Sequence, residues 1–158
     1  MNRHTDSVRV ARALLGLAGV AALLLSGPVG AAVAAPALRI ENAWISQPPP
    51  GSDIGAAYFT LHNTGTRGVA IIDVDCPLAS AAMLHESRVV AGQSQMRPVE
   101  RLEVAPGASR TLAPGGLHVM LHGLKRRLIV GESVPLVLKL EDGTHVSLTA
   151  RVRPPGSH

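Results

Sequence analysis

Short segments in which hydrophobic and polar residues alternate make up most of the chain after Pro36. No stretch of ten or more residues there repeats with the 3.6-residue period of a helix, and β-branched residues are frequent. Turn-forming residues separate the segments, as at Asn63-Thr64-Gly65 and Pro114-Gly115-Gly116. This pattern predicts an all-β domain.

Ten strands are predicted, and the last two form the clearest hairpin. Leu136, Leu138 and Leu140 alternate with other residues before the turn at Asp142-Gly143, and hydrophobic residues alternate in the same way after it. Many short strands at close spacing are typical of an antiparallel β-sandwich or a Greek-key barrel. The predicted strands cover residues 38–44, 56–62, 69–75, 82–90, 95–98, 101–104, 109–112, 117–122, 133–140 and 145–153.

The beginning of the chain has a different pattern. Arg3, Arg9 and Arg12 lead into an apolar run over residues 13–25, and small residues follow up to Ala34. This is the pattern of a secretory signal peptide, and the apolar run is shorter than the roughly 20 residues that span a bilayer. We therefore predict a cleaved signal peptide and a periplasmic or other extracytoplasmic location. The predicted parts are a signal peptide over 1–34, one β-sandwich domain over 35–153 and a short tail over 154–158.

The charge of the chain argues against a nucleic-acid partner. Lys and Arg number 15 against 11 Asp and Glu, and three of the Arg lie in the predicted signal peptide. Aromatic residues make up 2% of the chain, whereas a nucleic-acid site needs a basic patch with stacking aromatics. No arrangement of Ser, His and an acidic residue indicates a catalytic triad, so we also expect no enzymatic activity.

Soft metal ligands lie on one predicted strand, over residues 117–122. Side chains alternate between the two faces of a strand, so His118, Met120 and His122 share one face, and the hydrophobic residues between them face the core. His118 and Met120 are about 6.6 Å apart along such a strand, a distance that side chains can close onto one ion. The spacing permits chelation without requiring it.

A second pair of ligands flanks the turn at Ala91-Gly92. A two-residue loop there would place Met96 opposite Ser87, with His85 as its diagonal neighbour on the same face at about 7 to 8 Å. If this pair met the pair on strand 117–122 across one end of the sandwich, a site with two His and two Met would form. Thioethers favour Cu(I) and imidazole binds copper in either oxidation state, whereas zinc favours thiolate or carboxylate.

The spacing of these four residues resembles the pattern of the periplasmic copper chaperones called PCu(A)C. His85, ten residues, Met96, 21 residues and then His118-Val119-Met120 match the spacing H-x10-M-x21-H-x-M. Further segments are similar to that family, among them residues 55–60 and 114–121. The resemblance covers roughly residues 39 to 152.

This resemblance implies a cupredoxin-like β-sandwich that binds one Cu(I) through His85, Met96, His118 and Met120. It further implies that the protein delivers copper to the copper centres of respiratory cytochrome c oxidase outside the cytoplasmic membrane. The implied partners are the copper-site subunit of the oxidase and a thioredoxin-like Sco protein. No stable membrane insertion is expected after cleavage of the signal peptide.

Several positions near the four ligands differ from the family pattern or have two interpretations. Many family members have Met where this chain has Ser87, and an apolar residue or Met where it has His122. We expect His122 to support the ligands from outside the coordination shell. Glu86 could orient His85, although an exposed charge is the simpler interpretation. Met83 shares a face with His85, and we expect it to pack in the core.

Cys76 leaves a second class of copper protein open. A Cys with two His and a Met is the ligand set of blue-copper electron carriers, but Cys76 precedes the other candidates and is followed by Pro77. We therefore expect a buried or free thiol. No lipobox cysteine follows the apolar run of the predicted signal peptide, so we expect no lipid-anchored form. The alternatives are a cupredoxin-type electron carrier that uses Cys76, and a metal-free β-sandwich binding module.

Overall fold

The computed structural model describes residues 38–157, and every regular element in this range is a β-strand. The predicted signal peptide lies outside the described residues. All the predicted strands are present, with ends that differ by no more than two residues from those expected. The strands are β1 (Leu38–Ser46), β2 (Gly55–Asn63), β3 (Val69–Asp75), β4 (Ala81–Val90), β5 (Gln93–Pro98), β6 (Leu102–Val104), β7 (Ser109–Leu112), β8 (Leu117–His122), β9 (Ser133–Leu140) and β10 (His145–Arg153).

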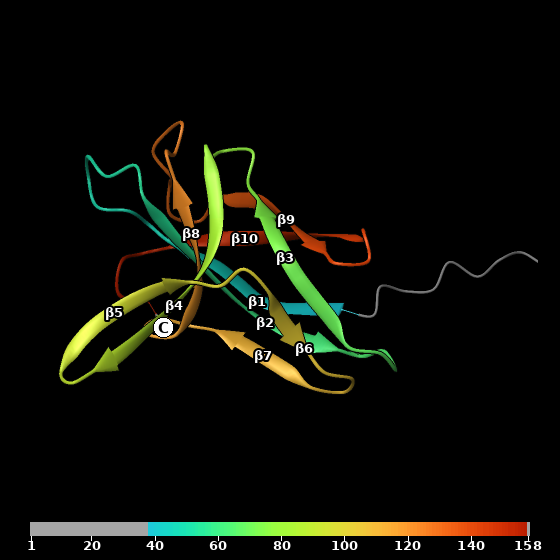
Figure 1. The fold of residues 1–158 in the computed structure, drawn as a ribbon. Helices are drawn as coiled ribbons and strands as arrows, with labels where there is room; N and C mark the ends of the chain where they lie inside the picture. Colours follow the sequence, from blue (N-terminus) through green and yellow to red (C-terminus); the bar gives the residue numbers. More distant parts are fainter. Residues whose placement is uncertain (1–37, 158) are drawn as a thin grey trace, which may run out of the picture. The chain divides into compact units, whose positions relative to one another are not determined.

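Seven of the strands form a closed barrel (Figure 1). Their order is β4-β8-β2-β1-β10-β9-β3, and a contact between Val74 and Ala82 returns β3 to β4. β5 extends the sheet beyond β4, β6 pairs with β3, and β7 pairs with β2. The pair β1–β10 is parallel and the other ladders are antiparallel, so the antiparallel prediction holds for all but this contact. Among the described residues, no helix has the length and apolarity needed to cross a membrane.

The hydrophobic core fills the inside of the barrel because alternate residues of each strand point inward. Along β2, Ala57, Phe59 and Leu61 are buried, and the residues between them are half-buried. Leu136 and Leu138 are fully buried in β9, as the alternation of leucines predicts. The outward positions of the same strands are therefore free to carry other side chains.

The hairpin of β4 and β5 extends away from the other strands (Figure 1). Its turn is formed by Ala91, with φ 51°, and Gly92, with φ 79°. Positive φ at both central residues is the mark of a type I′ turn, whose twist suits a two-residue hairpin. The register places Ser87 opposite Met96, as predicted from the loop length.

Candidate metal centre

The histidines and methionines of β4 and β8 lie opposite one another in neighbouring strands. His85 pairs with His118 and Met83 pairs with Met120 in the antiparallel ladder. The rings of His85 and His118 are 6.0 Å apart between centroids. The prediction that two ligand pairs meet across one end of a sandwich is wrong: the fold places them side by side on one face of one sheet, because β8 pairs directly with β4.

The fold holds one ring nitrogen of His118, Nδ1, and leaves the other, Nε2, available for a metal ion. His118 is 5% exposed, and its Nδ1 lies 2.9 Å from the carbonyl oxygen of Gly116. The backbone N–H of Ser87 donates to the same oxygen at 3.0 Å, which ties this carbonyl to β4. When Nδ1 carries the proton and donates to Gly116, Nε2 has the free lone pair that a metal needs.

His85 is half-buried, and its Nδ1 is buried without a hydrogen-bond partner. Burial lowers the pKa of His85, and the nearby imidazoles of His118 and His122 lower it further. A low pKa keeps the ring neutral, which is the form that binds metal ions. An unpaired buried nitrogen on a neutral ring beside a second imidazole fits a soft metal ion.

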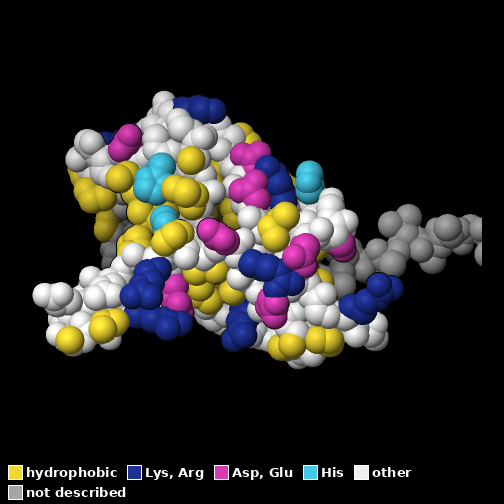
Figure 2. Space-filling model, in the orientation of Figure 1, with side chains coloured by type: hydrophobic (Ala, Val, Ile, Leu, Met, Phe, Trp, Pro, Cys, Tyr) yellow, Lys and Arg dark blue, Asp and Glu magenta, His cyan; other side chains and the backbone are white. Residues whose placement is uncertain are grey.

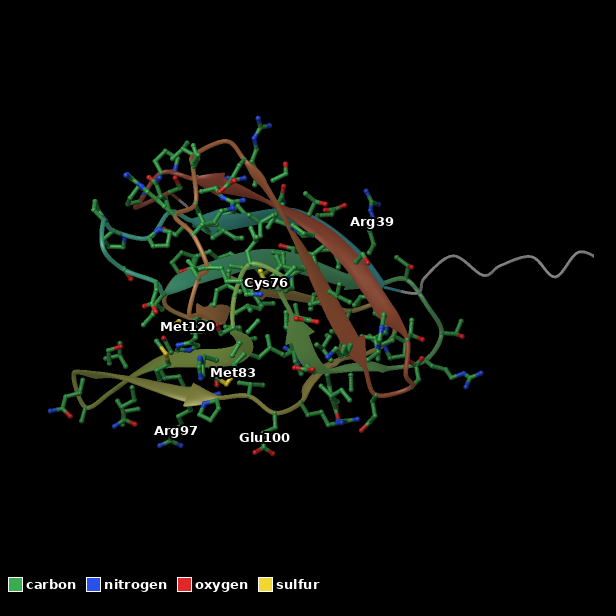
Figure 3. All side chains as sticks on the ribbon, turned by 90° about the horizontal axis from the view of Figure 1, so that it is seen from above. Arg39, Cys76, Met83, Arg97, Glu100 and Met120 are labelled. Carbon is green, nitrogen blue, oxygen red and sulfur yellow. The ribbon has the colours of Figure 1, made fainter. Side chains whose placement is uncertain are left out.

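Thioether groups surround the pair of histidines. Met96 follows on β5, diagonal to His85, and is 52% exposed. Met83 and Met120 lie at the same corner of the barrel (Figure 3). The prediction that Met83 packs in the core is wrong, because Met83 is 45% exposed and its neighbours Ala82 and Leu84 take the inward positions. The soft donors are therefore accessible from outside.

Two other residues named from the sequence lie near the ligands in different ways. His122 is on the same face as His118, and its ring centroid is 6.3 Å from that of His85. Glu86 alternates to the opposite face of β4, and its carboxylate pairs with Arg88 at 2.8 Å. Glu86 is half-buried and paired with Arg88, and it does not accept a hydrogen bond from His85, whose Nδ1 has no partner.

Cys76 is not part of this group. Its side chain is buried in the core, with 2% exposure, and burial raises the pKa of its thiol. Among residues 38–157, no three His, Cys, Asp or Glu side chains come together as a metal site. The Cys and two His of a blue-copper centre are therefore not assembled, and any metal site on this face depends on methionine.

An aromatic contact beside the ligands could not be identified from the sequence. The ring centroid of Tyr58 lies 6.4 Å from that of His118 and 4.5 Å from that of Trp44, whose plane is tilted by 35° to that of Tyr58. The guanidinium of Arg153 covers Trp44 at 5.2 Å. Trp44 is buried, with 6% exposure, and contacts both Tyr58 and Arg153. The pairing of β2 with β8 brings Tyr58 there, and a long-range pairing leaves no local signal in the sequence.

The surface of this region is exposed on one side of the barrel. Figure 2 shows histidine side chains surrounded by hydrophobic side chains, with groups of basic and acidic side chains at the margin. A partner approaching this face therefore meets soft donors first and charged residues around them.

Comparison with known proteins shows the family of this chain. The family described as "Putative lipoprotein LpqE-like" matches residues 38–152. The chain belongs to the LpqE-like family. It is 32% identical over 143 residues to a protein of Leifsonia xyli subsp. xyli named "Putative lipoprotein Lxx21020", covering 90% of this chain and 85% of that protein. Lipoproteins are exported, so the LpqE-like family is one of exported proteins. Cys76, the one cysteine of this chain, is buried in the barrel.

Solved structures with the same fold are PCuAC domains, so the resemblance to the PCu(A)C family is confirmed for this LpqE-like chain. The structure titled "Solution structure of CuI-DR1885 from Deinococcus Radiodurans" is 36% identical, with a TM-score of 0.59, and covers 78% of this chain and 83% of that chain. The structure titled "Copper-bound PCuAC domain from PmoF2" has a TM-score of 0.64 at 24% identity, covering 75% of this chain and 94% of that chain. The predicted cupredoxin-like fold is therefore correct, in a barrel form.

Proposed function

We propose that this LpqE-like protein is a periplasmic or other extracytoplasmic copper chaperone that holds one Cu(I) with His85, Met96, His118 and Met120. The observation that carries the proposal is the direct opposition of His85 and His118 on β4 and β8, with methionines at the adjacent positions of the same exposed face. The relationship to a protein whose structure is titled as a Cu(I) form supports the choice of metal.

The chemistry of the four donors favours a carrier over a store. Two thioethers and two imidazoles are neutral, so the bound ion keeps its positive charge and no thiolate holds it tightly. Met96 is exposed, and a partner can therefore replace this ligand first. Thioethers select Cu(I) over harder ions. The family is a copper-binding chaperone type, and we infer a carrier without catalytic activity.

We infer the destination of the copper from the resemblance to the PCu(A)C family. We infer that the acceptor is the copper-site subunit of cytochrome c oxidase and that a Sco-type protein is a further partner. Export of the family is consistent with an acceptor outside the cytoplasmic membrane. Mixing the Cu(I)-loaded protein with the apo copper-site domain tests this inference: copper should move to that domain, and its retention by the chaperone would reject this acceptor.

A Cu(I) titration tests the binding site. The protein is titrated without oxygen against a competing chromophoric chelator, in parallel with Met96→Ala/Met120→Ala. We expect one equivalent bound by the parent and binding about 100-fold weaker or worse in the double variant, because both thioethers are lost.

Val89→Ala is the matched control, because Val89 is an exposed apolar residue of the same hairpin without a donor atom. It should bind Cu(I) as the parent does. Equal binding by the parent and the double methionine variant would reject the thioether site, and the plain β-sandwich module would become the better interpretation.

A further inference from the structure

His122 lies at the end of β8 on the face that carries the proposed ligands. Its Nε2 is buried and, among the described residues, has no hydrogen-bond partner. The strand end that carries it is held closely: the N–H of Ser80 donates to the carbonyl of His122 at 2.9 Å. Gly123 follows with φ +61°, and a Cβ there would lie 2.7 Å from Oγ of Ser80. His122 is therefore a positioned imidazole with an unused nitrogen.

The ring of His85 has two histidine neighbours, His118 and His122. Its centroid is 6.0 Å from that of His118 and 6.3 Å from that of His122. Two imidazoles that bind one ion at metal–nitrogen distances of about 2 Å have ring centres about 5 to 6 Å apart. Both pairs are close to this separation, yet no three such side chains of the described residues converge on one point. His85 can therefore share an ion with either neighbour, and not with both.

Thioethers lie between the two histidine pairs. Met83 lies two residues before His85 on β4, and Met120 lies between His118 and His122 on β8. The ladder places Met83 directly opposite Met120. An ion shared by His85 and His122 thus has methionines beside it, as does an ion shared by His85 and His118.

We infer that His122 and Met83, together with the shared His85, form a second Cu(I) position beside the first. This inference rests on the proposed function and adds to it a path for the ion along the face. As the ion moves, its bonds to His118, Met96 and Met120 break and bonds to His122 and Met83 form, while the bond to His85 is kept. Copper remains Cu(I) and all ligands remain neutral, so the step needs no electron or proton. Because His85 serves both positions, one ion occupies the pair.

Removing Met96, a thioether that belongs to the first position and not to the second, favours the second position. Met96 is exposed and lies on β5, which is not a strand of the barrel, so Met96→Ala should fold like the parent. In this background we expect Cu(I) to occupy the second position. Met96→Ala/His122→Ala should then bind Cu(I) about tenfold more weakly, or worse, than Met96→Ala. Met96→Ala/His145→Ala is the matched control, because His145 is exposed at the start of β10.

NMR spectra of 15N-labelled protein report directly on whether a histidine ring nitrogen binds Cu(I). One equivalent of Cu(I) added to Met96→Ala should shift the Nε2 resonance of His122 and leave that of His145 unchanged. Equal Cu(I) affinity of the two double variants, or an unmoved His122 resonance, would overturn the second position. If the parent binds Cu(I) and Met96→Ala/Met120→Ala binds it about 100-fold more weakly, the proposed function stands in either case. If the parent binds no Cu(I), both proposals fail.

Discussion

The two opposed histidines are positioned by the fold in different ways. The Gly116 carbonyl fixes the ring of His118, whereas Nδ1 of His85 has no partner. A hydrogen bond to a backbone carbonyl fixes the orientation of an imidazole ring. A ring without such a bond can rotate toward either of its neighbours. His118 is therefore the fixed point of the site, and His85 is the adjustable one.

The lowered pKa of His85 makes the stability of the copper-free protein depend on pH. In the unfolded chain His85 has an ordinary pKa of about 6.5, and in the folded chain the value is lower because of burial and neighbouring imidazoles. The unfolded state therefore binds this proton more readily, and the free energy of unfolding should fall as pH drops through and below 6.5. Urea unfolding at several pH values measures this change. His85→Gln should reduce the slope, and an unchanged slope would contradict the assignment.

Copper binding should respond to pH through the same residues. Imidazole must be neutral to bind, whereas thioethers do not titrate. Because the pKa of His85 is below its usual value, Cu(I) affinity should be constant above about pH 6.5 and weaken only at more acidic pH. Competition titrations across this range provide the measurement. An affinity that stays constant to about pH 4 would show that the histidines are not ligands.

Cys76 should contribute to packing and not to copper binding. Its thiol is buried in the core and its pKa is raised. We expect Cys76→Ala to leave Cu(I) affinity unchanged and to lower the free energy of unfolding by about 1 kcal/mol. Titration and chemical unfolding of the same variant measure both effects. A large loss of Cu(I) affinity in a folded Cys76→Ala variant would favour the electron-carrier alternative.

At the scale of elements, the β4–β5 hairpin sets the position of Met96. Its turn requires positive φ at Ala91, where an alanine is strained and asparagine is favoured. Ala91→Asn should therefore raise the free energy of unfolding of the hairpin by about 0.5–1 kcal/mol without weakening Cu(I) binding. Amide hydrogen exchange of β5 measures the local effect.

A destabilising substitution in the same turn should have the opposite effect on the hairpin. Gly92→Val places a β-branched residue at φ 79°, so the hairpin should loosen and Cu(I) binding should weaken through Met96. If Gly92→Val binds Cu(I) as the parent does, the hairpin does not control the position of this ligand.

The strands could be predicted because each one carries its own pattern, and their contacts could be predicted only where the loop is short. The turn at Ala91-Gly92 gave the register of Ser87 and Met96 correctly. The pairing of β4 with β8 joins segments separated by several strands along the chain, so no local pattern indicates it. Met83 was misplaced for a related reason: in a short apolar segment, only the pairing shows which residues face inward.

At the scale of the whole molecule, the core and the proposed site occupy different sides of the same strands. Val119 and Leu121 of β8 are fully buried inside the barrel, and His118 and Met120 alternate with them on the other face. The barrel therefore holds the donors in place before any ion arrives. The family resemblance indicates the ligands, and the pairing of β4 with both β8 and β5 explains how residues distant in the sequence lie on one face.

Copper should stabilise the folded barrel, because an unfolded chain does not hold the donors together. Free Cu(I) at 100 times the dissociation constant should add about 2.7 kcal/mol to the free energy of unfolding. Thermal unfolding measures this increase, with and without Cu(I), in the presence of a chelator that sets the free Cu(I) concentration. Met96→Ala/Met120→Ala should show little of it, and an equal increase in that variant would place the copper elsewhere.

X-ray absorption spectroscopy of the Cu(I)-loaded protein tests the central claim most directly. A site of two imidazoles and two thioethers predicts nitrogen and sulfur scatterers in equal number around copper, with the sulfur contribution retained in Cys76→Ala and reduced in Met96→Ala/Met120→Ala. A first shell without sulfur, or sulfur scattering that disappears in Cys76→Ala, would contradict the thioether site on β4, β5 and β8.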